Sequence, residues 1–549
     1  MFIAWLILIM AEKQKAPVFA REATGLIRQF GASEHFISNL NGVVPIFAPA
    51  FTAWFIWYAI PGGSVIGATI GSFFFAAFGF VTAYALMCAT FPRSAAPYVA
   101  QSRILTPWIA FPAESMMWLS IISFMAIIPF GYVIEWGLAP GLYMMGTMTN
   151  NAGLVSLSYW STTATGTILI GTLFLLVSLV PAILGTRFLI RTFQFPMFIL
   201  ATLGLIVTLG ILIGANSAQF VASFNQIESP LQYSNLVSIG QQLNPQAFVP
   251  TSFSLLTLMA AIGTTGGSVN SYWNSYAMGE MKRANSAKTQ VICMAGPCLI
   301  LTLCIIAIVK LEENLVGKSQ LIALTQIGTL NATQLPNALF GGGVVTTSVP
   351  YILAGNPWVV CFLMISIIAA AFTFMPINWL LASRDPFAWA MDRLIPAKFA
   401  EVNERFHTPV FTLIFAFILA EVFLIFSATT SILGLLFSVT WAWSAMGVAA
   451  LCAACVVLPF RKSYFDQSPV RWKVAGIPIV SVVGAIGLIF CIDLFSTYML
   501  VPALGFGGPL QAILISSYVT VFILYWVIKY IRKHQGIDIN MAFRTIPPE

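Results

Sequence analysis

The sequence predicts an all-α polytopic membrane protein with about 12 transmembrane helices. Apolar residues make up 59% of the 549 residues, and charged residues only 8%, against roughly 25% in soluble domains. The apolar residues gather in runs of bilayer length, and two of these runs contain helix breakers at corresponding places. This composition excludes an ordinary soluble domain.

Apolar runs long enough to span a bilayer begin after a mixed-charge segment that ends near Glu34. The preceding stretch, Met1–Ala11, is too short to span, so either Met10 is the true start or the stretch lies at the membrane interface. The predicted spans are residues 36–59, 63–90, 108–137, 165–185, 193–214, 251–278, 289–309, 357–382, 409–429, 432–458, 475–499 and 511–528.

Lysine and arginine are distributed unevenly between the two sides of this map. The side of the N-terminus carries 23 of them, and the other side carries only Lys310 and Lys318. Basic residues near span ends are retained in the cytoplasm. We therefore expect both termini to be cytoplasmic, in a protein of the cell membrane. The uncharged segment Leu138–Ala164 is expected to be an external loop.

Span six is interrupted by Gly263-Thr264-Thr265-Gly266-Gly267. Backbone groups freed from a helix cost several kcal/mol in hydrocarbon, so a break is tolerated where it is buried in protein or lines a cavity. The alternative is that the glycines only permit close packing of helices. Span one has a corresponding interruption at Asn41-Gly42-Val43-Val44-Pro45, followed by Pro49.

Two broken helices at matching places in two groups of five indicate a 5+5 inverted repeat, as found in secondary transporters. The predicted organisation is a cytoplasmic N-terminal segment, a first repeat, an extracellular loop, a second repeat, peripheral helices 11 and 12, and a cytoplasmic tail. Their bounds are 1–35, 36–214, 215–250, 251–458, 459–528 and 529–549.

The segment after span eight carries a recognisable pattern. It begins Ser383-Arg384-Asp385-Pro386, continues through Asp392 and Pro396, and ends Thr408-Pro409-Val410. This pattern resembles the loop signature of the amino acid-polyamine-organocation (APC) superfamily, which includes archaeal and bacterial amino acid permeases. Gly279-Glu280-Met281-Lys282 is similar to the "GE.K" element of that superfamily. Phe91–Tyr98 is similar to its turn after span two, with alanines in place of the usual glycines.

The resemblance implies a leucine-transporter-type fold, in which the backbone at both breaks holds the amine and carboxylate of the solute. The usual Gly-Ser-Gly of span one is absent, so carboxylate recognition does not simply carry over. An amine or another small organic solute therefore stays open beside an amino acid. The matching substrate-binding positions are Asn41, Gly42, Val43, Val44, Ile262, Gly263, Thr264, Thr265 and Gly266.

Two residues are candidates for coupling transport to an ion. Glu114 lies within span three, where burying a carboxyl in the membrane costs free energy and therefore suggests a functional role. The alternative is a carboxyl bonded to a neighbouring helix. Thr373 of span eight is a possible Na⁺ ligand. The lysine that some proton-coupled relatives carry in span five is absent. The coupling ion is thus Na⁺ or H⁺, or the protein exchanges solutes without an ion.

Arg384 and Asp385 are expected either to close an inner gate or to anchor the loop. All three histidines lie outside the predicted spans, which argues against a histidine relay in the membrane. We find no pattern for a catalytic residue, a metal site or a cofactor. The sequence therefore predicts a secondary active transporter of amino acids or related amines, working by alternating access. A solute sensor that does not transport is the alternative.

Overall fold

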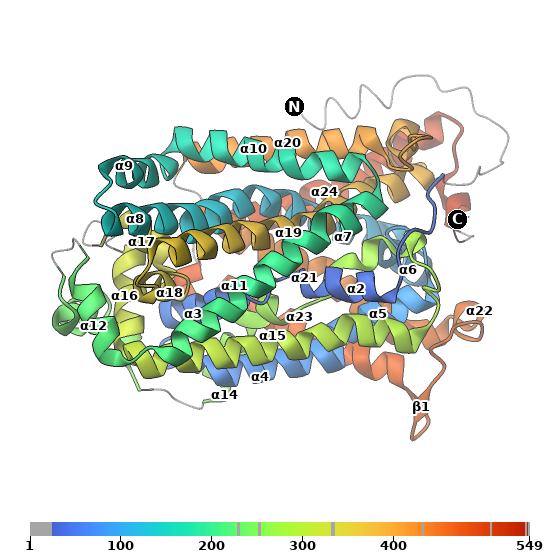
Figure 1. The fold of residues 1–549 in the computed structure, drawn as a ribbon. Coiled ribbons are helices and arrows are strands. Elements are labelled where there is room, and N and C mark those ends of the chain that lie inside the picture. Colours follow the sequence, from blue (N-terminus) through green and yellow to red (C-terminus); the bar gives the residue numbers. More distant parts are fainter. Residues whose placement is uncertain are drawn as a thin grey trace.

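Long apolar helices run side by side along the molecule (Figure 1). The computed structural model describes residues 25–227, 231–250, 254–330, 335–430, 433–504, 508–543 and 546. The predictions for Met1–Ala11 and for the start of span six at residues 251–253 lie outside these ranges.

Ten helices of the described part are long and apolar enough to cross a bilayer. These helices confirm the all-helical polytopic fold. The two remaining predicted spans, one and six, are divided into shorter pieces. Span one consists of α2 (Ala32–Leu40) and α3 (Ala48–Ala59), and span six begins with α14 (Leu255–Thr265).

Each unbroken span corresponds to one helix or to a continuous series of helical segments. The spans are α4–η1–α5 (Val65–Thr90), α7–η2–α8 (Pro107–Met148), α10 (Ala164–Ile183), η3–α11 (Phe188–Gly214), α15 (Ala287–Val316), α19 (Pro357–Met391), α20 (Val410–Thr429), α21 (Leu433–Val457), α23 (Ile479–Leu500) and α24 (Pro509–His534).

Shorter elements connect the spans. They are α6 (Ala96–Ile104), α9 (Ala152–Ser161), α12 (Ser217–Asn225), α13 (Leu236–Leu243), α16 (Lys318–Leu330), α17 (Asn337–Phe340), α18 (Ser348–Leu353), α22 (Lys462–Phe465), α25 (Ile539–Ala542) and the antiparallel pair β1 (Lys473–Val474) and β2 (Ile477–Pro478).

The starts of several helices follow from local sequence. The Ser64 side chain accepts a hydrogen bond from the Gly67 N–H at the start of α4, and Asn356 caps α19 through the Trp358 N–H. Both are favoured N-cap residues. Pro357 occupies the first turn of α19, where its missing N–H costs nothing.

Several predicted span ends are too early, and the two largest differences are at spans three and eight. The expected external loop Leu138–Ala164 is mostly helical, because α7 continues through the π-helical segment η2 (Ile128–Leu138) into α8, and α9 follows. Span eight does not end at residue 382, since α19 runs on to Met391. A helix that is buried in protein can exceed the thickness of the bilayer, so apolar length alone places its end too early.

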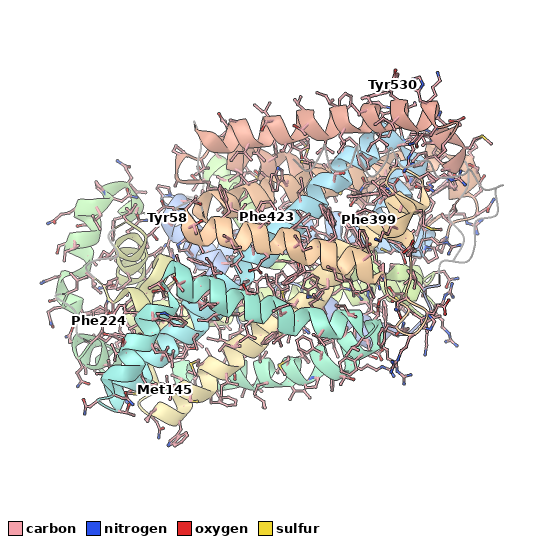
Figure 2. The ribbon with its side chains drawn as sticks, turned by 90° about the horizontal axis from the view of Figure 1, so that it is seen from above. Tyr58, Met145, Phe224, Phe399, Phe423 and Tyr530 are labelled. Carbon is pink, nitrogen blue, oxygen red and sulfur yellow. The ribbon has the colours of Figure 1, made fainter. Side chains whose placement is uncertain are left out.

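The connecting elements divide between the two ends of the bundle (Figure 1). We call the end with α8, α9, α12 and α16 the outer end, and the end with α6, α22, the hairpin and α25 the inner end, following the predicted orientation. Lys310 and Lys318 flank the junction of α15 and α16. Seen from above, Met145 and Phe224 lie toward the outer end, and Phe399 and Tyr530 toward the inner end (Figure 2).

Candidate functional site

The break in span one is a stretch of turns between α2 and α3. The Gly42 N–H donates to the Asn39 carbonyl, and the Phe47 N–H donates to the Val44 carbonyl. Val44 has a φ of 58°, which is strained for a β-branched residue. Strain of this kind costs about 1–3 kcal/mol and persists only where the surroundings impose it. The interruption predicted at residues 41–45 is therefore present and conformationally costly.

The break in span six begins slightly later than its glycines suggest. The helix α14 includes Gly263 and ends at Thr265, and a 3₁₀ turn follows at Gly266–Val269 (η6). Asn270 is then extended, with a ψ of 154°. The rest of the predicted span contains only two further 3₁₀ turns, η7 (Trp273–Tyr276) and η8 (Met278–Glu280). The second half of span six is thus not α-helical.

The two breaks lie against each other. The helix α3 packs on η6, and α2 packs on η7. The Asn274 N–H donates to the Asn39 side-chain oxygen over 3.1 Å. A Cβ at Gly42 would collide with the Trp273 ring, so only glycine fits at this position. The structure thus brings the predicted positions of span one next to the non-helical part of span six.

Buried polar atoms remain unsatisfied at both breaks. Neither the nitrogen nor the oxygen of the Asn41 side chain has a hydrogen-bond partner in the described part of the chain, and the Asn270 side-chain oxygen has none either. Asn41 is fully buried and Asn270 is 2% exposed. An unsatisfied buried polar group costs about 1–3 kcal/mol. A polar ligand between the breaks would provide the missing partners.

Aromatic rings connect the two breaks on the outer side. Trp441 of α21 packs on Gly267, and its ring centroid is 6.0 Å from that of Phe124 on α7. Phe124 is 6.0 Å from Tyr132, which is 4.7 Å from Phe47 at the start of α3. These four rings cover the region between the breaks with apolar and π surface.

Several predicted site residues on α14 face neighbouring helices. A Cβ at Gly263 would meet Thr497 of α23, and Ile262 packs against Gly71 of α4. The hydroxyls of Thr264 and Thr265 both donate to the Ala261 carbonyl over 2.8 Å. Close helix packing, the alternative considered for these glycines, therefore accounts for Gly263. Gly266 also permits close helix packing, because it lies against the Phe490 ring of α23.

Glu114 is fully buried in α7 and connects three elements. It accepts hydrogen bonds from the Gln101 side chain of α6 and, over 3.1 Å, from the Tyr276 hydroxyl of η7. Asp385 of α19 is also fully buried, and neither of its oxygens has a hydrogen-bond partner in the part of the chain that is described. Two buried carboxyl groups are thus carried by helices that contact η7 of the broken span.

The inner end is held together by two buried ion pairs. Arg384 of α19 binds Glu280 of η8 at 2.6 Å and also donates to the Thr186 hydroxyl. Arg103 of α6 makes a bidentate pair with Asp392, with N–O distances of 2.5 and 2.7 Å. Burial disfavours the Arg103 guanidinium, but the facing Asp392 outweighs this effect and raises the pKa of Arg103.

Only part of this inner cluster is predictable from the sequence. The two predicted residues, Arg384 and Asp385, lie on the helix α19 rather than in a loop. Glu280 and Asp392 lie inside the two segments that resemble the superfamily motifs, so the sequence could have indicated a role for them. Nothing in the sequence around Arg103 indicates that it pairs with Asp392.

Thr373 is buried, and its hydroxyl donates to the Ala370 carbonyl of its own helix over 2.7 Å. The Thr373 carbonyl accepts a hydrogen bond from the Gln194 side-chain amide of span five, and the Gln194 side-chain oxygen accepts one from Ser38 of α2. A neutral amide in span five therefore bridges spans one and eight. The sequence alone indicates only that a lysine is missing from this span.

His35 lies inside the bundle, contrary to the expectation that all histidines lie outside it. Its ring is fully buried in α2 and contacts Gln290 of α15 at 3.0 Å and the Asn274 side chain at 2.9 Å. Burial lowers the pKa of buried histidines in general because it disfavours the charged form. The residue just precedes the predicted span, and the hydropathy boundary fell one residue too late.

The fold and the paired breaks define a membrane transporter that is built around two broken helices. The crystal structure of MhsT in complex with L-phenylalanine has the same fold, with a TM-score of 0.54 at 13% identity over 86% of this chain and 99% of that chain. No curated protein sequence matches.

The amino acid permease family model matches residues 36–528. The chain therefore belongs to the amino acid permease family, within the superfamily that its motifs resemble, and it is a multi-pass secondary transporter of amino acids.

Proposed function

We propose that the chain carries neutral amino acids with apolar side chains by alternating access around the two breaks. The observation that carries this proposal is the set of unsatisfied side-chain atoms of Asn41 and Asn270, buried on facing breaks. These amides suit the amine and carboxylate of the solute. The surrounding rings of Phe124 and Trp441 suit an apolar side chain. MhsT, which shares the fold, was crystallised in complex with L-phenylalanine, and this agrees with the proposed class of solute.

The conformation that best fits these contacts is closed at the inner end. The ion pairs Arg384–Glu280 and Arg103–Asp392 fasten α19 to η8 and to α6. On the outer side, Tyr132 lies between the break at Phe47 and a cavity beside Glu135. Alternating access would then require the inner pairs to separate while the aromatic residues close.

For coupling, we favour a proton over sodium. Glu114 and Asp385 are two buried carboxyls within the membrane-spanning helices, and such groups carry protons in pumps and transporters. At Thr373, by contrast, the hydroxyl that is the possible Na⁺ ligand donates to the Ala370 carbonyl of its own helix, and the Gln194 amide binds the carbonyl of the same residue. Protonation of Glu114 would alter the hydrogen bond to Tyr276, which follows the break in span six.

The orientation proposed is with both termini in the cytoplasm of the cell. The described basic residues of the α6, α22 and α25 regions gather at the inner end, and positively charged ends are retained inside.

Uptake into proteoliposomes tests the proposal. Full-length protein should accumulate labelled neutral amino acids saturably when an inward proton gradient is imposed, and a sodium gradient should have no effect. Asn41→Ala should lower the apparent affinity by about tenfold, the effect of one or two lost polar contacts. Asn540→Ala, at an exposed asparagine of α25, is the matched control.

Absence of saturable uptake for every amino acid tested would contradict the proposal. Binding without uptake would instead support a solute sensor, and sodium-driven uptake would refute the proton as the coupling ion.

A further inference from the structure

A cavity of about 220 Å³ lies on the outer side of the bundle, between α3, η2 and the loop before α18. Its walls include four aromatic side chains and one carboxylate, and small or apolar residues complete them. Glu135 is the only charged residue in this lining. The aromatic and acidic wall residues are Phe51, Trp54, Tyr132, Glu135 and Trp136.

The aromatic side chains that line the cavity pack against one another. The rings of Tyr132 and Trp136 stack with centroids 4.6 Å apart, and Phe51 meets both edge-on at 5.3 and 5.1 Å. All three residues are buried. Electron-rich faces of Trp and Tyr attract cations, most strongly where water is excluded. The cavity is thus lined by a packed set of rings with a negative partner beside it.

The Glu135 carboxylate makes no polar contact that stabilises the described part of the fold. In the described ranges it forms neither a hydrogen bond nor an ion pair. Its two oxygens point at the turn Gly341–Gly342: a Cβ would lie 3.6 Å from Oε1 at Gly341 and 3.3 Å from Oε2 at Gly342. Gly342 also has a φ of +66°, which disfavours any side chain there. Glu135 and Gly342 both line the cavity, so the carboxylate lies in the cavity wall beside this turn.

The lining selects an organic cation over a metal ion. Ca²⁺ and Mg²⁺ require six or more oxygen ligands, whereas this cavity offers one carboxylate among aromatic rings. A quaternary or primary ammonium group gains from both, because its charge meets the carboxylate and its carbon atoms meet the ring faces.

We propose that this cavity is a binding site for a small organic ammonium ion, separate from the solute site between the breaks. Tyr132 contributes to the cavity wall and contacts Phe47 and Phe124, so the aromatic residues that cover the breaks divide the two sites. A cation bound there contacts both the rings and Gly342, and it therefore stabilises the cavity in its present shape. The site therefore gives amines a means of regulating entry from the outer side.

Calorimetric titration of the purified full-length protein with choline chloride tests this proposal. The comparison ligand is the uncharged analogue of choline in which carbon replaces nitrogen. The wild type should bind choline saturably and bind the analogue at least about tenfold more weakly. Glu135→Gln should weaken choline binding by about tenfold or more. Glu421→Gln, the same change on α20 at a residue outside the cavity lining, should leave it unchanged.

A second pair of variants keeps the test decisive if Glu135→Gln does not fold. Trp136→Leu should weaken choline binding severalfold through loss of a ring face, whereas Trp358→Leu, at a side chain that is 80% exposed, should not. Failure of the wild type to bind choline, equal binding of the analogue, or unchanged binding by folded Glu135→Gln would overturn the proposal. Choline binding is measured without transport, so such a result leaves the uptake test of the proposed function unaffected.

Discussion

Arg384 and Glu280 form an ion pair 2.6 Å long although their side chains are only 1% and 0% exposed. The pair fastens α19 to the last turn of the broken span six. Two charges at this depth are stable only because each satisfies the other, and removing one partner leaves an uncompensated charge. The pair therefore joins α19 to the broken span at the inner end, and whether it opens during transport can be tested.

We predict that Glu280→Gln opens the inner end. Loss of one partner of a buried pair costs about 3–5 kcal/mol, which favours any conformation in which Arg384 reaches water. Cys88 is a native reporter, because it is buried and its thiol lies 3.8 Å from the Ser275 carbonyl of η7. Its labelling by a maleimide, quantified by peptide mass spectrometry, should rise at least severalfold.

The matched control for this experiment is Glu401→Gln, the same change at an exposed glutamate near the inner end. It should leave Cys88 labelling at the level of the wild type. Unchanged labelling in Glu280→Gln would mean that the pair only anchors the helix end, which is the alternative stated for Arg384.

Glu114→Gln should uncouple transport from protons while the fold is retained. Glutamine keeps the shape of the side chain and can still accept a hydrogen bond from Gln101 or Tyr276, but it cannot bind and release a proton. Counterflow of labelled amino acid should therefore persist, whereas accumulation against a gradient should fall to the equilibration level. Glu421→Gln serves as the control. Proton-driven accumulation by Glu114→Gln would assign the coupling elsewhere.

Gly263→Ala should destabilise the protein through packing, in contrast to the role in binding that the sequence suggested. An added Cβ would collide with Thr497 of α23 and lie 3.1 Å from the Asp493 carbonyl. Overpacking of this kind costs about 1–3 kcal/mol. Gly210→Ala on α11 is the control, because nothing lies within 4 Å of its added Cβ. We expect the thermal midpoint of unfolding to fall for Gly263→Ala and to hold or rise for Gly210→Ala.

The sequence predicted the architecture well, because hydrocarbon imposes length and composition on every spanning helix. The break positions also followed from glycine and proline. Side-chain directions did not, since Ile262 and Gly263 face α4 and α23 only as a consequence of how those helices pack. Pairings such as Arg103 with Asp392 join residues far apart in the chain, and no local pattern encodes them.

The chain between the spans was also poorly predicted. Hydropathy marks where the apolar run stops, but protein neighbours decide where the helix stops. In α19 the polar residues Ser383, Arg384 and Asp385 stay helical because they are buried against other helices instead of lipid. For the same reason His35 is inside the bundle although a hydropathy boundary excluded it.

Val44 and Val43 form a natural pair for testing whether the break in span one is strained. Both are buried, at 2% and 7% exposure, so replacement by glycine removes a similar apolar side chain from each. Only Val44 has a positive φ, of 58°, and glycine relieves strain of about 1–3 kcal/mol at such a position. Val44→Gly should therefore lower the free energy of unfolding by about 1–2 kcal/mol less than Val43→Gly does.

Chemical denaturation in detergent, followed by tryptophan fluorescence, measures the difference. Equal destabilisation by the two variants would mean that the turn at Val44 stores no strain, and that the break in span one owes its shape to packing against Trp273 alone.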